Sequence, residues 1–310
     1  MIDTRKVLFS LLQIAVTVGL LVWLIRWLGV GPFQEAISSL TVFSAVGALA
    51  IGTAATLVQA RRWRLISSGY NIHVGRREAV AKCWQAGFLN SILPGGLAGD
   101  AVRAVEQRRS STWSGSIGSV LGERLAGTAV MFAAATIALY PAYPNVGVLA
   151  ALLTAGTVRI AWPSLKRLVG SVRWEVFGLA AAGWVLFAAL FLIAVMTTGA
   201  TEVLTRASAY EVFALTALTL AGMSVPLSLG GWGPREGAAA LVFPLFGSSP
   251  EVGVAVAFSY GILALISVLP GALVLVYRLL VRPRQKLPRG GEVEVRTDVL
   301  PKAHPTGGSR

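Results

Sequence analysis

The sequence lacks the residues from which most cross-links and metal sites are built. Its one cysteine, Cys83, excludes a disulfide within the chain, and two histidines, His73 and His304, exclude a histidine-rich metal site. It contains none of the patterns GxSxG, HExxH, GxGxxG or the phosphate-binding loop of nucleotide hydrolases. We therefore expect no metal, no cofactor and no enzymatic activity.

Charged residues are also scarce, at 13% against 55% hydrophobic residues, and the mean hydropathy of the 310 residues is +0.69. This balance excludes an ordinary soluble domain and predicts an all-α polytopic membrane protein. The net charge of +13 favours cytoplasmic retention of Lys and Arg and contact with anionic lipid at basic clusters, rather than nucleic acid.

Apolar runs predict about six full transmembrane helices, because roughly 20 apolar residues cross the hydrocarbon core. The runs are residues 7–28, 40–60, 116–142, 146–158, 176–198 and 252–276. With these spans, 24 of the 27 Lys and Arg residues lie on one side of the membrane. The exceptions are Arg26, Arg206 and Arg235. That bias predicts a multi-pass protein of the cytoplasmic membrane with both termini in the cytoplasm, where residues 281–310 form a disordered basic tail.

Two further apolar stretches are broken by proline and glycine, so that neither arm is long enough to cross. Residues 79–103 are interrupted at Pro94, Gly95, Gly96 and Gly99, and residues 212–246 at Pro226, Gly230 and Gly231. Such backbone is tolerated at membrane depth only where protein buries it or a polar cavity solvates it. We predict two re-entrant helical hairpins; counting their arms as spans gives an alternative of seven or eight crossings.

The order of these segments repeats. Residues 1–142 and 143–280 each hold two spans, one hairpin and one more span, and the second set starts from the opposite side. Interrupted helices at matching positions of inverted repeats indicate the binding site of a transporter. We expect the two breaks to meet near the midplane, with Arg103 and Arg235 directed into one shared polar cavity.

The residues of the breaks suit an anionic group. Helix N-termini favour phosphate, and arginine binds its oxygens through two hydrogen bonds. Asp100 and Glu236 could hold the arginines when no substrate is bound, or contact a cationic head group or a proton, and Trp232 could line the cavity. The candidate substrate-binding residues are Asn90, Pro94, Gly95, Gly96, Gly99, Asp100, Arg103, Glu123, Arg124, Gly230, Gly231, Trp232, Arg235 and Glu236.

Simpler interpretations stay open for several of these residues. The breaks can be tight loops, Arg103 can be one more cytoplasmic cation, and Glu123 and Arg124 can form a structural pair. Gly118, Gly122 and Ala126, four residues apart, predict a face on which another helix approaches closely.

The sequence resembles the flippase-like membrane proteins related to the transmembrane region of lysylphosphatidylglycerol synthase. The resemblance rests on the segment from Asn90 to Arg103, on Gly122-Glu123-Arg124-Leu125 and on residues 226–237, with Ala98 and Glu123 where relatives often have glycine and aspartate. It implies movement of a phospholipid or a polyprenyl-phosphate-type lipid between leaflets. We expect no synthase domain, because only a short basic tail follows the spans, and a homo-oligomer stays open.

Two other classes of function remain as alternatives. An integral-membrane transferase acting on a lipid-linked substrate would need Asp100, Glu123 or Glu236 as its acid or base. A non-catalytic scaffold would recruit a partner through its basic tail. A transporter without a nucleotide motif would be driven by an ion gradient, the membrane potential or the substrate gradient.

Overall fold

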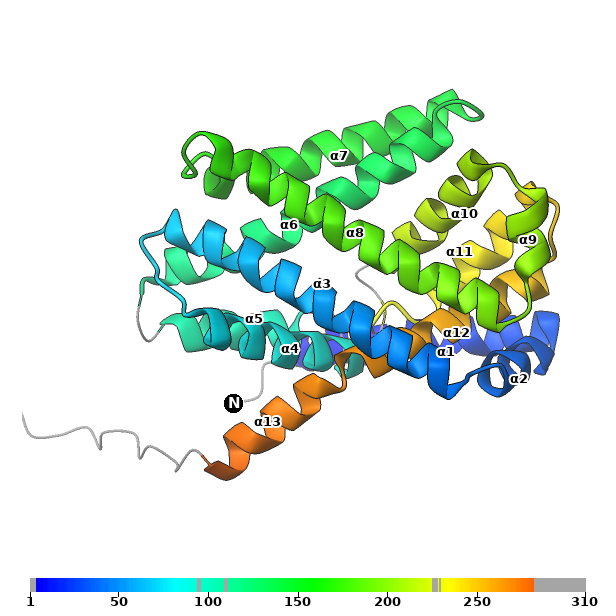
Figure 1. Ribbon diagram of the computed structural model, residues 1–310, viewed down its shortest axis with the longest axis horizontal. Coiled ribbons are helices and arrows are strands. Elements are labelled where there is room, and N and C mark those ends of the chain that lie inside the picture. The colour runs from blue at the N-terminus through cyan, green and yellow to red at the C-terminus, as the bar shows by residue number, and fades with distance from the viewer. Residues whose placement is uncertain (1–3, 94–95, 109–110, 225–227, 229, 282–310) are drawn as a thin grey trace, which may run out of the picture.

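The computed structural model describes residues 4–93, 96–108, 111–224, 228 and 230–281, and every regular element within these ranges is a helix (Figure 1). The six long apolar segments are α1 (Thr4–Leu28), α3 (Val42–Ser68), α6 (Trp113–Leu139), α7 (Pro144–Leu165), α8 (Ser171–Thr197), and α12 (Pro250–Val268) continuing into α13 (Pro270–Val281). Each contains a stretch long and apolar enough to cross a membrane. The prediction of an all-helical protein with six membrane-spanning segments is therefore confirmed.

Shorter helices lie between the long ones. They are α2 (Gly31–Ser38), α4 (Arg76–Ile92), α5 (Ala98–Arg108), α9 (Thr201–Arg206), α10 (Ala209–Ala221) and α11 (Pro234–Val242), with 3₁₀ turns at Gly222–Ser224 and Phe243–Phe246. Helices α4 and α5 pack together, as do α10 and α11, at the positions of the two predicted hairpins. Their re-entry from opposite sides and the inverted relation of the two halves stay predictions.

The second span ends later than the sequence predicts, and two connecting segments contain helices. The second span was expected to end before the basic residues 61–64, but α3 continues to Ser68, because Arg62 pairs with a buried carboxylate inside the bundle. Gly31 and Pro32, between the first two predicted spans, begin α2, where proline is tolerated because its missing N–H would have no partner in the first helical turn. Helix α9 lies between the fifth predicted span and the second broken stretch.

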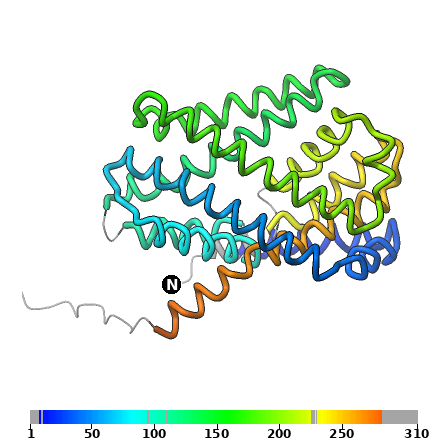
Figure 2. Tube along the Cα trace, in the orientation of Figure 1, coloured from blue at the N-terminus to red at the C-terminus, as the bar shows by residue number. Residues whose placement is uncertain are grey.

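Helix α3 occupies a central place, since it packs against α4, α6, α8 and α12. In Figure 1 it crosses the front of the molecule, with α4 and α5 toward the left end and α10 and α11 toward the right. The tube view shows the same arrangement, with α7 along the top (Figure 2); α7 packs against α6, which also contacts α3, α5, α8 and α10. The largest apolar core joins α8, α10 and α12 around Phe191, Leu215 and Tyr260.

The predicted small-residue face of α6 is a helix contact, as expected. A Cβ added to Gly122 would lie 2.6 Å from the Cβ of Ser164 on α7, so only glycine permits this approach. The Ser164 hydroxyl donates to the Gly118 carbonyl at 2.9 Å. Ala126 is fully buried in the adjoining cluster with Ala161.

Candidate functional site

The first break is closed by the side chain of Asn90, near the end of α4. Its Oδ1 accepts a hydrogen bond from the backbone N–H of Gly99 at 2.8 Å, and its Nδ2 donates to Asp100 at 3.2 Å. A Cβ at Gly99 would collide with the backbone of Ala86, so α5 can lie this close to α4 only with glycine there. The amide of Asn90 and the missing side chain of Gly99 together bring Asp100 to the tip of the pair.

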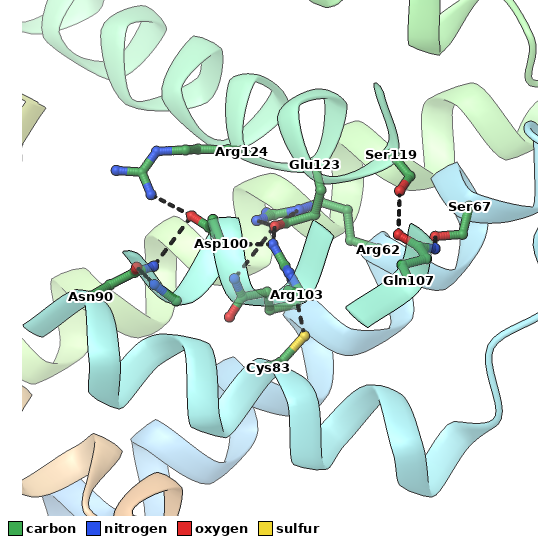
Figure 3. A network of polar contacts seen from close by, with 12 residues as sticks. Arg62, Ser67, Cys83, Asn90, Asp100, Arg103, Gln107, Ser119, Glu123 and Arg124 are labelled. Carbon is green, nitrogen blue, oxygen red and sulfur yellow. Dashed lines mark hydrogen bonds and ion pairs between the residues drawn. The ribbon is translucent and has the colours of Figure 1, made fainter. Parts of the chain in front are cut away.

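Asp100 is the meeting point of two arginines from different helices. Arg103, one turn later on α5, donates to its Oδ1 at 2.8 Å, and Arg124 of α6 donates to its Oδ2 at 2.7 Å (Figure 3). The same Nη1 of Arg124 donates to the carbonyl of Gly96 at 2.9 Å. Arg124 therefore ties the first break to the long helix α6.

Glu123, the neighbour of Arg124 on α6, is buried and pairs with two other arginines. Arg103 donates to its Oε2 at 2.9 Å, and Arg62 of α3 donates to its Oε1 through Nε at 3.0 Å and through Nη2. Gln59, one turn before Arg62, donates to Oε2 at 3.4 Å. Arg103 also lies 4.8 Å from the ring centroid of Trp63, a cation–π contact.

The network thus joins three guanidinium groups to two carboxylates. Arg103 and Glu123 are almost completely buried, with side-chain exposures of 1% and 2%, whereas the side chain of Arg124 is 41% exposed. Within the described residues, the three arginines exceed the two carboxylates by one positive charge, and the exposed guanidinium that can present this charge is Arg124. Placing charged side chains at membrane depth costs free energy, so this buried network is a candidate functional site.

The second break is built differently and is electrically balanced. Glu236 accepts a hydrogen bond from the backbone N–H of Gly233 at 2.6 Å, capping α11, and pairs with Arg235. The guanidinium of Arg235 lies between the rings of Trp232 and Tyr260, at 4.8 and 5.3 Å from their centroids. These contacts use Arg235 to hold α11 against α12.

A cavity of about 370 Å³ lies between the two breaks. Asn90, Ser91 and Gly96 of the first break line it, as do Gly230 and Gly231 of the second. The breaks meet directly, since a Cβ at Gly230 would lie 2.7 Å from the carbonyl oxygen of Ser91. The two breaks therefore line one cavity, as expected, but most of its surface is apolar.

The prediction that Arg103 and Arg235 point into this cavity was wrong. The charged residues that line the cavity are Arg62, Asp100, Glu123 and Arg124. Arg103 and Arg235 are each 1% exposed and lie behind the lining, where carboxylates and aromatic rings hold them. Gly99, Trp232 and Glu236 also lie outside the lining, and Trp232 packs against Phe258 of α12 at 5.1 Å between ring centroids.

Pro94, Gly95 and Pro226 lie outside the described residues. The sequence interpretation missed Arg62 and Gln59, both of which line the cavity. The available signal was their spacing, because Thr56, Gln59 and Arg62 follow one another at intervals of three and share a face of α3. Among the described residues, no group of three or more His, Cys, Asp or Glu side chains could hold a metal ion.

Comparison with known families agrees with this placement of the motifs. Residues 10–174 match the family described as the lysylphosphatidylglycerol synthase TM region. The chain belongs to this family. The match spans more than half of the sequence and contains Asn90, Asp100, Arg103, Glu123 and Arg124, whereas it ends before the second break.

Membership of the lysylphosphatidylglycerol synthase TM region family, together with the six apolar segments, identifies a multi-pass membrane protein with a lipid-related function. No curated protein and no solved structure matches the chain.

Proposed function

We propose that the chain moves an anionic lipid, or a lipid-linked anionic head group, between the leaflets of the cytoplasmic membrane, with both termini in the cytoplasm. The observation that carries the proposal is Arg124, which presents the surplus positive charge of a buried network to a cavity between two helix breaks. A charge of this kind recognises phosphate in a low-dielectric site.

The guanidinium of Arg124 has its bidentate edge available. Both of its hydrogen bonds to the network, to Gly96 and Asp100, use Nη1. The edge formed by Nε and Nη2 makes no hydrogen bond or ion pair with the residues that the structure describes. That edge offers two parallel N–H groups to the oxygens of a phosphate.

The size of the cavity supports a head group as its occupant. A volume of about 370 Å³ lies at the lower end of the roughly 300–1,000 Å³ usual for ligand pockets. Acyl chains would remain in the surrounding hydrocarbon while the polar group occupies the cavity. Movement of one break against the other would then open the cavity toward alternate sides, as in transporters whose sites lie between broken helices.

Reconstitution into liposomes with a fluorescent phosphatidylglycerol tests the proposal, with dithionite reduction reporting exchange between leaflets. We expect Arg124→Gln to slow exchange about tenfold or more, because a charged hydrogen bond contributes about 1.5–3 kcal/mol. The matched control is Arg206→Gln, because Arg206 forms an exposed ion pair with Glu202 on α9, away from the cavity.

Exchange at the wild-type rate in Arg124→Gln liposomes, with Arg206→Gln also at that rate, would reject the site. A chemically altered lipid in the same liposomes, detected by mass spectrometry, would favour the transferase alternative.

A further inference from the structure

Each oxygen of the two carboxylates in the cavity already accepts a hydrogen bond from an arginine or an amide side chain. Asp100 receives Arg103 on Oδ1, and Arg124 and Asn90 on Oδ2. Glu123 receives Arg62 on Oε1, and Arg103 and Gln59 on Oε2. An ammonium group entering the cavity would therefore meet carboxylates that are already paired, beside a surplus positive charge.

Apart from the two carboxylates and from Arg62 and Arg124, the polar side chains of the lining are uncharged, and most of them are hydroxyl or amide groups. The hydroxyls of Ser91, Thr128 and Ser267 donate to carbonyls of their own helices, those of Gly87, Arg124 and Ala264, at 2.7–3.1 Å. A hydroxyl that uses its hydrogen in this way keeps oxygen lone pairs as acceptors. Such a wall suits a ligand that carries hydroxyl donors.

From these observations we infer that the site selects a lipid with one phosphodiester and an uncharged, hydroxyl-bearing head group, and disfavours the lysyl-modified form of such a lipid. The inference rests on the proposed function for its site and deepens it by naming the class of substrate. The single surplus charge matches one phosphodiester, and the hydroxyl oxygens match glycerol or a sugar. Lysylation adds ammonium groups for which the described lining offers no unpaired carboxylate.

Two kinds of lipid share this chemistry: a glycerophospholipid such as phosphatidylglycerol, and a polyprenyl-phosphate sugar. Native mass spectrometry of the purified protein in detergent can rank them by competition. The probes are phosphatidylglycerol, its lysyl ester, phosphatidylmethanol, phosphatidylcholine and polyprenyl-phosphoglucose. Phosphatidylmethanol keeps the phosphodiester charge without a free hydroxyl, so it separates the two parts of the inference.

We expect phosphatidylglycerol or polyprenyl-phosphoglucose to bind about tenfold or more tightly than the lysyl ester and phosphatidylcholine, and several-fold more tightly than phosphatidylmethanol. The stronger of the first two identifies the source of the head group. Equal binding of the lysyl ester and phosphatidylglycerol would overturn the charge argument, and equal binding of phosphatidylmethanol and both hydroxylated lipids would overturn the hydroxyl argument.

Variants of two threonines on α6 refine the test. Thr128→Val should remove most of the preference for phosphatidylglycerol over phosphatidylmethanol. Thr136→Val is the matched control, since Thr136 donates to the carbonyl of Phe132 in the same way but is outside the cavity lining. Loss of the preference in both variants, or in neither, would contradict the inference.

Binding and transport are read separately, which keeps the two proposals distinguishable. Selective binding without movement in liposomes would reject the proposed transport and leave the selectivity standing. Movement of lipid in liposomes with no preference among head groups would reject the selectivity and leave the proposed transport standing.

Discussion

Neutralising Glu123 tests the buried network most severely. Glu123→Gln keeps the size of the side chain but removes the charge shared by Arg62 and Arg103. Arg103 retains Asp100, whereas Arg62 pairs with no other carboxylate in the part of the chain that the structure describes. Leaving a buried charge uncompensated costs about 3–5 kcal/mol. We expect that loss in the free energy of unfolding.

The loss can be measured by titrating the protein in mild detergent with SDS, with tryptophan fluorescence reporting the unfolding. Glu175→Gln is the control, because Glu175 pairs with Arg61 where the side chains are 34% and 64% exposed. An exposed pair contributes about 0–1 kcal/mol. The network as described would be refuted if both substitutions had the same effect.

A double-mutant cycle identifies the partner. If the charge of Arg62 is the group left uncompensated, Arg62→Met combined with Glu123→Gln should destabilise the protein less than the sum of the single changes, with a coupling of at least about 1 kcal/mol. Additive losses would show that Arg62 does not depend on Glu123.

Two other substitutions test contacts away from Glu123. Gly230→Ala should destabilise the protein about 1–3 kcal/mol more than Gly247→Ala in the same titration. Both glycines have positive φ, but of the two only Gly230 lies against another backbone, that of Ser91. Equal losses of stability would argue against contact between the breaks. Arg278→Gln should lower the free energy of unfolding by about 2 kcal/mol, because Arg278 of α13 donates to Gln85 of α4 at 2.6 Å and to Glu106 of α5 at 3.2 Å. An unchanged unfolding midpoint would show that these contacts do not anchor α13.

The spans could be predicted from the sequence because their signal is local. Each is a run of apolar residues, and the six segments of the structure correspond to the six predicted runs. The breaks were visible for the same reason, since proline and glycine interrupt two further apolar stretches. Whether the hairpins re-enter the membrane depends on depth in the bilayer, a property of the surroundings and not of local sequence.

The lining of the cavity was harder to predict because it depends on which partner each charge finds. Arg62 stands in a cluster of basic residues that resembles a cytoplasmic helix end, and only Glu123, 61 positions later, explains its burial. Arg235 was expected in the cavity because it departs from the charge bias. Glu236 and the ring of Trp232 hold it instead. The available indication was Glu236 three residues after Gly233, a position from which a carboxylate can accept a hydrogen bond from the backbone N–H at the start of a helix.

The most direct test of the central claim is density for a bound head group in the protein reconstituted into nanodiscs of phosphatidylglycerol. We predict a phosphate within hydrogen-bond distance of Nε and Nη2 of Arg124, between Gly96 and Gly230, with its acyl chains outside the cavity. A well-resolved cavity without a head group, with lipid phosphates bound only at the outer surface of the bundle, would contradict the account.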